Sequence, residues 1–306
     1  MTGSPTPRPK RFSALALALA PEREPKLAFP PRGSALIGPV EAPALQVMSY
    51  NIRRRGPELL PRSPDLWRRR RPLIKRLLAA EQPALLGVQE ALFTQARFVR
   101  QALGEHYRSI GYGREKNTGG EGCPIFYDSR RLQVIEWRQT ALSDTPNIPG
   151  STSWGNRTPR IVVEAIFLDL ATGIQFQAIN THLDHRSRTS RLRSADALRS
   201  IVQATPHPTI MTGDFNTDAA TDPYDQLTGN GLLVDTWDTA AERVTQVWGT
   251  FPNYGPPKHN RKRIDWVLAT PSVTALQAAI NVTRYERGWP SDHAPVQAVV
   301  RLARTE

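Results

Sequence analysis

Cysteine is almost absent from the sequence, which holds one such residue, Cys123, in 306. A single thiol excludes a disulfide within the chain and is typical of a protein that works in a reducing compartment. No apolar run is long enough to span a bilayer, so we expect no contact with a membrane. The N-terminal segment FSALALALA follows basic residues, but it is short and Pro21 and Glu22 end it at once. A cytoplasmic location is therefore favoured over secretion.

Internal repeats and interdomain linkers are also lacking beyond residue 43. Nine of the 27 prolines fall within the first 43 residues, among small and charged residues without sustained periodicity. Such a segment buries too little surface to order itself, which predicts a flexible tail over residues 1–43. From Ala44 onward the composition is uniform. We therefore expect one domain over residues 44–306, and a monomer.

Acidic residues are too few to balance the basic ones. The chain has 40 lysines and arginines against 28 aspartates and glutamates, which gives a net charge of +12. A surplus of this size favours encounter with polyanions such as nucleic acid or phosphorylated metabolites. Arginine makes up much of the excess, however, and an arginine-rich composition also serves solubility. The charge alone leaves both interpretations open.

Short apolar runs alternate with helical patterns along the domain. The apolar runs predict strands at residues 44–50, 84–89, 160–170, 174–180, 209–213, 263–270 and 294–302. Apolar residues at helical spacing predict helices at residues 65–81, 94–103 and 188–204. A hairpin signal, the Thr172–Gly173 turn, is mixed with helical crossovers. This combination predicts an α/β or α+β domain in which two packed sheets lie beneath outer helices.

Six apolar runs carry polar residues at one end. These residues are Asn51, Glu90, His182 with Asp184, Asp214 with Asn216, Asp265, and Asp292 with His293. A turn or a helix cap explains any single Asp or Asn, because both residues favour these positions. Turns and caps do not require Glu90 or His182, so the recurrence indicates a shared function. If the strands form two packed sheets, their ends meet at one rim, where clustered carboxylates need a cation.

The residue types indicate which cation such a rim binds. Hard oxygen donors with scattered histidines and no cysteine cluster suit Mg²⁺, or Mn²⁺, better than Zn²⁺. Mg²⁺ in proteins usually takes one or two carboxylates and completes its shell with water and substrate phosphate oxygens. The remaining polar side chains are then available to bind a phosphate and to orient a water. A metal ion, groups that bind a phosphate and an oriented water are what phosphoester hydrolysis requires.

Six short motifs, SYNIR, GVQEA, INTHLDH, TGDFN, RIDWV and SDHAPV, follow one another within residues 45–301. Their sequences and order resemble the signature of the endonuclease/exonuclease/phosphatase superfamily, which includes deoxyribonuclease I. The resemblance implies an α/β fold, a four-layer sandwich of two packed mixed sheets flanked by helices, with the active site at one sheet edge. It also implies a Mg²⁺-dependent hydrolase of phosphoester bonds that acts by in-line attack of an activated water.

The resemblance assigns roles around the metal and the phosphate. Glu90 resembles the principal Mg²⁺ ligand, Asn51 lies beside it, and Asp292 is similar to a second contributor to the metal region. Asn216 resembles the residue that orients the attacking water against the phosphate. Arg160, at the start of its strand, is expected to bind the phosphate as well.

The resemblance also assigns the acid and the base. Asp214 resembles the residue that polarises the water, and His293 and His182 resemble imidazoles that contact the phosphate. The implied carboxylate partners are Asp265 for His293 and Glu121 for His182. A histidine held by a carboxylate is favoured in its charged form, so it donates to a phosphoryl oxygen near neutral pH. The sequence leaves open whether Asp214 or the Asp265–His293 pair is the general base, and we favour Asp214.

Loops determine which phosphoester such a site accepts. The loops concerned are residues 111–124, 143–158 and 249–263. Their aromatic residues Trp154, Phe251 and Tyr254 either stack on a base or sugar or pack beneath the loops. The run at residues 259–263 is the best candidate for contact with a phosphate backbone. The four arginines at residues 68–71 are expected to form a solvated helix face, with contact to an anionic substrate as the alternative.

We expect the substrate to be a phosphodiester of nucleic acid, in DNA or RNA. A small phosphorylated metabolite or a lipid headgroup is the alternative within the same chemistry. The alternative of another class is a polyanion-binding module that keeps the fold without catalysis. Such a module would require at least one degraded motif, and none of the six is degraded.

Overall fold

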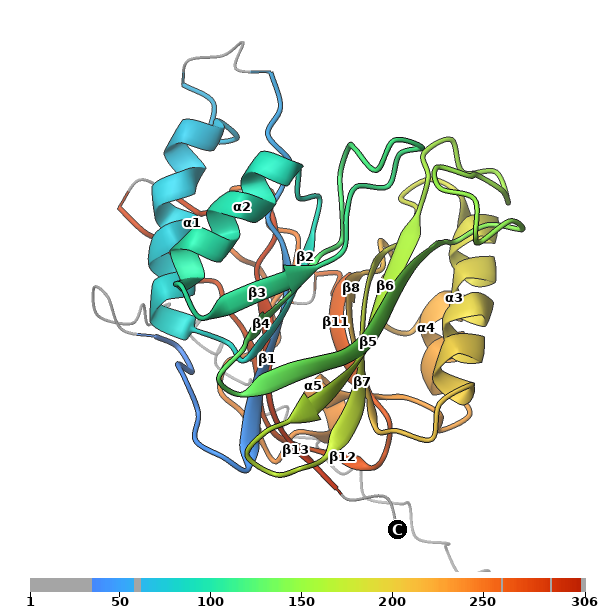
Figure 1. Cartoon of the computed structure of the whole chain (residues 1–306). Helices are drawn as coiled ribbons and strands as arrows, with labels where there is room; N and C mark the ends of the chain where they lie inside the picture. The colour runs from blue at the N-terminus through green and yellow to red at the C-terminus, as the bar shows by residue number, and fades with distance from the viewer. Residues whose placement is uncertain (1–34, 58–61, 260, 287, 304–306) are drawn as a thin grey trace, which may run out of the picture.

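The protein consists of two β-sheets packed face to face, with helices on the outer face of each (Figure 1). The computed structural model describes residues 35–57, 62–259, 261–286 and 288–303. The layers run helix, sheet, sheet, helix, which confirms the four-layer α/β sandwich expected from the sequence. The apolar N-terminal segment and most of the predicted tail lie outside the described residues. Within the described residues, no helix combines the length and the apolar character needed to cross a bilayer.

The first sheet has seven strands in the order β10-β12-β13-β1-β2-β4-β3. Their bounds are β1 Ala44–Asn51, β2 Leu85–Gln89, β3 Tyr107–Ile110, β4 Ile125–Asp128, β10 Glu242–Arg243, β12 Val273–Ile280 and β13 Val296–Leu302. Two helices, α1 (Trp67–Glu81) and α2 (Phe93–Leu103), cover its outer face. Side chains alternate along β1, so Leu45 and Val47 face the other sheet while Met48 and Tyr50 face the helices.

The second sheet has six strands in the order β5-β6-β7-β8-β11-β9. Their bounds are β5 Leu132–Ala141, β6 Ile161–Asp169, β7 Gln175–His182, β8 Thr209–Asp214, β9 Val234–Asp235 and β11 Asp265–Ala269. Helices α3 (Arg188–Gln203) and α4 (Asp222–Thr228) cover its outer face, and the short α5 (Thr236–Thr239) contacts β11 and β12. In α3, Ala195, Leu198 and Val202 form the buried stripe that the helical spacing predicted.

A polar contact joins the two sheets where they approach most closely. The amide of Asn180 in β7 donates to the carbonyl oxygens of Val88 and Cys123, and its oxygen accepts from Gln89. Gly87 makes this approach possible, because an added Cβ would stand 2.6 Å from Oδ1 of Asn180. The contact fixes β2 against β7 next to the ends of both strands.

Part of the segment assigned to the tail is packed on the domain. Backbone N–H groups of residues 36–38 donate to the carboxylate of Glu81 in α1, at 2.7 to 3.2 Å. Glu81 is 2% exposed and also accepts from the amides of Asn281 and Gln297. A buried carboxylate requires such donors, and the N-terminal segment supplies three of them. Residues 36–38, which the composition assigned to the tail, therefore contact the domain through Glu81.

An ion pair closes the turn between β6 and β7 and provides a test of the fold. Both carboxylate oxygens of Asp169 bind Arg131, at 2.6 and 2.9 Å, and Thr172 donates to the same carboxylate. Burial would raise the pKa of Asp169, but the hydrogen bonds from Arg131 and Thr172 outweigh it and lower the pKa. A folded-state pKa below the unfolded value means stability that is present above about pH 4 and lost as the pH falls.

We expect Asp169→Asn to lower the free energy of unfolding by about 2 kcal/mol at pH 7, since hydrogen bonds to a charged group are lost. The difference from the wild type should shrink below about pH 4, because the Asp169 carboxylate of the unfolded wild-type chain is protonated there while that of the folded protein is protonated only at a lower pH. Urea unfolding at pH 7 and pH 3 measures both values. Glu136→Gln, on an exposed carboxylate of β5, serves as the control. An equal difference at the two pH values would contradict the assignment.

Candidate active site

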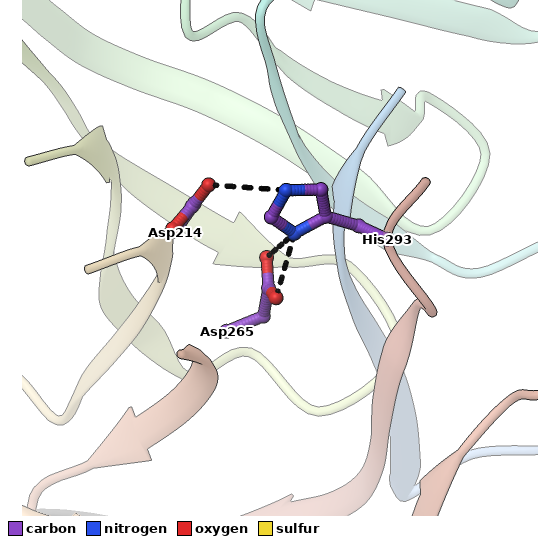
Figure 2. A group of neighbouring side chains, drawn as sticks. All are labelled: Asp214, Asp265 and His293. Atoms are coloured by element: carbon purple, nitrogen blue, oxygen red, sulfur yellow. Dashed lines mark hydrogen bonds and ion pairs between the residues drawn. The ribbon is translucent and has the colours of Figure 1, made fainter. Parts of the chain in front are cut away.

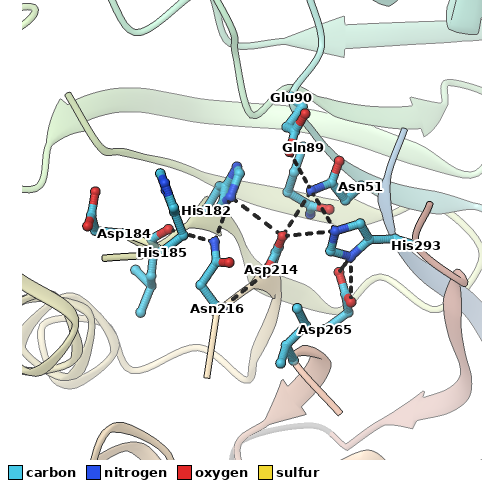
Figure 3. A network of polar contacts seen from close by, with 12 residues as sticks. Asn51, Gln89, Glu90, His182, Asp184, His185, Asp214, Asn216, Asp265 and His293 are labelled. Atoms are coloured by element: carbon cyan, nitrogen blue, oxygen red, sulfur yellow. Dashed lines mark hydrogen bonds and ion pairs between the residues drawn. The ribbon is translucent and has the colours of Figure 1, made fainter. Parts of the chain in front are cut away.

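The ends of several strands meet at one edge of the two sheets (Figure 3). Strands β1 and β2 run parallel, so Asn51 at the end of β1 and Glu90 just after β2 lie side by side. Strands β7 and β8 are also parallel and pair His182 with Asp214 at their ends. On the other side of β8, the antiparallel β11 begins with Asp265 opposite Asp214. The shared rim that the apolar runs predicted is therefore present.

Asp214 lies at the centre of this group. Its Oδ2 accepts a hydrogen bond from Nδ2 of Asn51 at 2.9 Å. The same oxygen lies 3.5 Å from Nε2 of His182 and 3.7 Å from Nε2 of His293. Its other oxygen accepts the backbone N–H of Asn216 at 2.9 Å. One buried carboxylate is thus held by two N–H donors between two imidazoles.

His293 is paired with Asp265, as the resemblance implied (Figure 2). Nδ1 of the imidazole lies 2.9 Å from Oδ2 and 3.2 Å from Oδ1 of the carboxylate. Burial would lower the pKa of His293, but the carboxylates of Asp265 and Asp214 outweigh it and raise the pKa to about 10. Burial and the nearby Asp265 raise the pKa of Asp214 to about 7. Near neutral pH the site therefore holds a cationic imidazole next to a carboxylate that exchanges protons readily.

His182 differs from the expectation. Its Nε2 lies 2.8 Å from Nδ2 of Asn216, whereas the carboxylate of Glu121 binds Arg114 at 3.0 Å and Arg54 at 3.5 Å. Burial and the positive charges of Arg160 and Arg114 hold the pKa of His182 well below its usual value. The pairing of Glu121 with His182 and the charged state of His182 are therefore corrected. Burial and the two arginines therefore favour the neutral form of His182, although Oδ2 of Asp214 lies 3.5 Å from its Nε2.

Glu90 and Asp292 both lie close to the guanidinium of Arg53, at the other end of the site. Oε1 of Glu90 accepts from Nδ2 of Asn51 at 3.1 Å, and Oε2 accepts the backbone N–H of Arg54 at 3.0 Å. Arg53 lies 3.7 Å from Glu90 and 3.6 Å from Asp292. Burial would raise the pKa of Glu90, but the hydrogen bonds from Arg54 and Asn51 outweigh it and lower the pKa. Glu90 is accordingly ionised and partly open to a further ligand.

The donor set fits a hard divalent cation. Carboxylates of Glu90, Asp214, Asp265 and Asp292 gather here, and burial together with a neighbouring carboxylate raises the pKa of both Asp214 and Asp292. Negative charge in this quantity suits Mg²⁺ or Mn²⁺. Asp214, Asp265 and His293 offer ligand atoms within 4.8 Å of one another. The ring of His293 is paired with Asp265, and the carboxylate of Glu90 beside Asn51 is a further oxygen donor at this edge.

Arg160 lines the same recess as Glu90 and His182. Its Nε lies 3.3 Å from Asp184 and its Nη2 lies 3.1 Å from Nδ1 of His185. Sequence patterns assigned no role to Asp184 and His185, and the structure shows that they orient this guanidinium. The remaining nitrogen, Nη1, is buried without a hydrogen-bond partner among the described residues. A buried, unpaired N–H group next to the site suits a phosphoryl oxygen.

The arginines at residues 68–71 are not the uniform solvated face that the sequence predicted. Arg70 is fully buried and donates to the carbonyl oxygens of residues 52, 53 and 54 at 2.7 to 3.2 Å. These carbonyls belong to the segment that follows Asn51 and brings the N–H of Arg54 to Glu90. The burial of one arginine within an exposed run explains why periodicity did not reveal it. Arg70 therefore holds in place the backbone segment that contacts Glu90.

The loop residues proposed for substrate contact also divide into two groups. Trp154 donates to Asp144, and the hydroxyl of Tyr254 donates to Asp65, so both rings anchor loops. Arg263, the last residue of the basic run 259–263, is 7% exposed and binds Asp235 at 2.9 Å. Phe251 is 47% exposed, and its ring centroid lies 4.8 Å from that of His293. The ring of Phe251 therefore lies against a residue of the site, His293.

A four-layer sandwich with carboxylates, amides and imidazoles gathered at one sheet edge defines a protein of the deoxyribonuclease I-like fold. The chain belongs to the endonuclease/exonuclease/phosphatase family, whose family model matches residues 48–293. The superfamily resemblance of the six motifs is thereby confirmed.

Proteins similar to this chain include two from Bacteroides thetaiotaomicron with solved structures. An endonuclease/exonuclease/phosphatase family protein is 30% identical, with a TM-score of 0.80 over 85% of this chain and 98% of the other. A mannosyl-6-phosphatase is also 30% identical, with a TM-score of 0.78 over 84% of this chain and 99% of the other. Nocturnin of Xenopus laevis is 26% identical over 74% of this chain.

The chain spans only part of the curated relatives that it matches, covering 32% of the length of Drosophila melanogaster nocturnin and 63% of the Xenopus protein. The family assignment and the similar structures support the coarse class, a phosphoesterase.

Proposed function

We propose that the protein is a divalent-metal-dependent phosphoesterase that hydrolyses a P–O bond by in-line attack of water, with a phosphodiester of nucleic acid as substrate. The position of Asp214 supports this most strongly. Its Oδ2 lies 3.5 Å from Nε2 of neutral His182 and 3.7 Å from Nε2 of cationic His293. A base and an acid are thus available within one small volume.

Asp214 is the general base of this proposal. Its pKa of about 7 suits proton exchange near neutral pH, and Oδ2 is the atom that accepts the proton of the attacking water. The raised pKa of His293 argues against a basic role for the Asp265–His293 pair, because an imidazole that keeps its proton is not a base. Nδ2 of Asn216 lies 2.8 Å from Nε2 of His182, so these two side chains orient the attacking water together.

His293 and Arg160 act on the phosphate. The imidazolium of His293 donates through Nε2 to a phosphoryl oxygen, where negative charge grows as the water adds. Asp265 keeps that ring in place by binding Nδ1 at 2.9 Å. Nη1 of Arg160, buried without a partner among the described residues, donates to another phosphoryl oxygen from the recess that it shares with His182.

Glu90 and Asn51 would hold Mg²⁺ or Mn²⁺, with Asp292 close by. The ion, when bound, neutralises charge on the phosphate oxygens. We expect EDTA to remove activity and added Mg²⁺ to restore it, because several buried carboxylates otherwise repel an anionic substrate. Restoration is measured as the rate of bis-p-nitrophenyl phosphate cleavage against added ion. Full activity after exhaustive chelation would contradict the metal assignment.

A second substrate class is favoured by one comparison. The similar mannosyl-6-phosphatase, at 30% identity over nearly its whole length, acts on a sugar phosphate by its name. A small phosphomonoester is therefore the alternative for this chain. The same residues serve both substrate classes, because Asp214, His293 and Arg160 address only the phosphate.

The test is a panel of substrates with the full-length protein and Mg²⁺ or Mn²⁺. The panel holds bis-p-nitrophenyl phosphate, plasmid DNA, an RNA oligonucleotide and mannose 6-phosphate. Cleavage of nucleic acid without phosphate release from mannose 6-phosphate is the expected result. Phosphate release from mannose 6-phosphate without cleavage of nucleic acid supports a phosphomonoester as the substrate. If no substrate is turned over, the proposal that the protein is an enzyme is contradicted. The Asp214→Asn variant, purified in parallel, detects contaminating nuclease.

A further inference from the structure

A groove of about 440 Å³ is lined in part by Phe251, the residue whose ring contacts His293, and takes no part in the chemistry described above. We call it the flanking groove. Its lining includes Phe251, Pro252, Ile264 and three cations, Lys258, Arg261 and Lys262. Its volume lies within the range of about 300–1,000 Å³ that is usual for small-molecule sites. The groove has room for a part of the substrate beyond the scissile phosphate.

Phe251 connects the flanking groove to the active site. Its ring centroid lies 4.8 Å from that of His293, and the two rings are tilted by 54°. With 47% of its surface exposed, Phe251 still offers a ring face to a ligand. A flat ring is the ligand group on which an exposed aromatic face stacks best.

Backbone hydrogen bonds fix the groove to the catalytic strands. The hydroxyl of Thr250 accepts the N–H groups of Ile264 and Asp265, and its carbonyl accepts the N–H of Ala294 next to His293. The N–H of Thr250 donates to the carbonyl of Lys262 at 3.1 Å. A ligand in the groove is thus held at a fixed distance from the reacting phosphate.

Three positive charges in the groove lack balancing partners. Lys258, Arg261 and Lys262 are exposed, and within the described part of the chain none has an ion pair. Arg263, one residue further on, differs from these three cations, because it is buried and pairs with Asp235. Gly249 lets the segment approach, because an added Cβ would overlap Cβ of Arg261. Cations presented together without counter-charges favour a polyanionic ligand.

The combination of a ring face and several cations distinguishes between substrates. A sugar monophosphate has one phosphate, which the catalytic residues occupy. Its sugar can pack on Phe251, but the three cations are left without a partner. A single-stranded nucleic acid offers bases that stack on aromatic side chains and further phosphates at regular spacing. Stacking needs an unpaired base, which favours a single strand over a duplex.

We propose that the flanking groove binds the nucleotide next to the scissile phosphate of a single-stranded nucleic acid, with its base on Phe251 and its phosphate on Lys258, Arg261 and Lys262. This inference rests on the proposed function, since it names the substrate class of the same active site. It makes Phe251 and the three cations determinants of specificity that no catalytic step requires.

Binding of fluorescein-labelled hexathymidylate, measured by fluorescence anisotropy in Mg²⁺, tests the groove. The Asp214→Asn protein is the background, so that no turnover occurs. The groove variant carries Lys258→Gln, Arg261→Gln and Lys262→Gln. The control variant carries Lys75→Gln, Arg97→Gln and Arg100→Gln, on residues of α1 and α2, and loses the same charge. We expect the groove variant to raise Kd about tenfold more than the control.

Two further measurements separate direct binding from general charge. The slope of log Kd against log salt should fall by about 2 in the groove variant, because each phosphate that a cation neutralises on a single strand accounts for about 0.7. Phe251→Ala should raise Kd about tenfold, and Phe251→Tyr should restore binding, because stacking survives in tyrosine. Equal weakening by the groove and control variants overturns the proposal. So does unchanged binding by Phe251→Ala, or the absence of any hexathymidylate binding.

A separate activity measurement distinguishes failure of the groove from failure of the enzyme. Cleavage of bis-p-nitrophenyl phosphate by the wild-type protein reports the phosphoesterase alone, because this substrate has no second phosphate. Cleavage of this substrate, combined with equal hexathymidylate binding by the groove and control variants, would reject the proposed role of the groove. The proposed phosphoesterase activity would be kept. If the same three substitutions, made in the wild-type background, instead abolish turnover only of mannose 6-phosphate, the flanking groove serves a sugar phosphate and the nucleotide assignment is overturned.

Discussion

Replacing Asp214 by asparagine is expected to lower kcat/KM by about 10³-fold, equivalent to about 4 kcal/mol of transition-state stabilisation. The carbonyl oxygen of asparagine can still accept the N–H of Asn216, so the backbone stays in place. The new NH₂ group would then replace Oδ2 and face Nδ2 of Asn51, a donor against a donor. The base is lost while the fold is kept. Initial rates on bis-p-nitrophenyl phosphate measure the effect.

Asp128→Asn is the matched control for this substitution. Asp128 is also a buried aspartate, at 8% exposure, but it ends β4 away from the site and pairs with Arg130. We expect the kcat/KM of the Asp128→Asn protein to stay within about twofold of the wild-type value, since an ion pair near the surface contributes little. An Asp214→Asn protein that keeps more than a tenth of wild-type activity would exclude Asp214 as the general base.

Replacing Arg70 by leucine is expected to lower the free energy of unfolding by about 3–5 kcal/mol. The guanidinium is fully buried, and its loss removes one donor each from the carbonyl oxygens of residues 52, 53 and 54, of which that of Arg53 still accepts from Gln95. Those residues connect Asn51 to the N–H of Arg54 that binds Glu90. Activity should therefore fall even at temperatures where the variant remains folded. Urea unfolding and initial rates on the same preparation measure the two effects.

Arg69→Leu controls for the loss of one charge from the same helix. Arg69 is exposed, and within the described residues its side chain donates to one carbonyl, that of Arg62, at 3.3 Å. We expect a change of less than about 0.5 kcal/mol, as for most surface substitutions. Similar destabilisation by the Arg69 and Arg70 substitutions would mean that the buried hydrogen bonds of Arg70 do not support the site.

The polar strand ends were predictable because of strand geometry. Apolar runs that stop at Asn51, Glu90 and Asp214 are short, buried and parallel to a neighbouring strand, so their ends meet at the same edge. The pairing of His293 with Asp265 followed the motif order and agrees with the 2.9 Å distance between Nδ1 and Oδ2. Local sequence was sufficient here, because each residue comes at the end of a regular element.

The environment of His182 was not predictable in the same way. Its charge depends on Arg114 and Arg160, which reach the recess from a loop and from the start of another strand. No periodic pattern relates these residues to His182, and arginines are frequent throughout the sequence. Glu121 lies in the expected region, yet Arg114 and Arg54 bind it instead. Long-range charge interactions of this kind require coordinates.

Two of the strands that the sequence did not predict, β5 and β12, lack a clear apolar pattern. Strand β5 (Leu132–Ala141) is buried only at its first and last residues, so it shows no apolar run. Strand β12 (Val273–Ile280) contains a register shift between Ala275 and Gln277, which breaks the alternation. The strands that were predicted are central and buried on both faces, where the apolar signal is strongest. The three predicted helices agree with α1, α2 and α3 to within two residues.

The central claim is that Glu90 and Asn51, brought by β1 and β2, hold a divalent ion next to the base and acid at Asp214 and His293. Crystals soaked with Mn²⁺ and inorganic phosphate, and recorded at the manganese absorption edge, locate the ion directly. We predict one anomalous peak bonded to a carboxylate oxygen of Glu90, with phosphate reaching toward His293. A peak ligated by Asp214, Asp265 and His293, whose ligand atoms lie within 4.8 Å of one another, with Glu90 outside its shell, would contradict the claim.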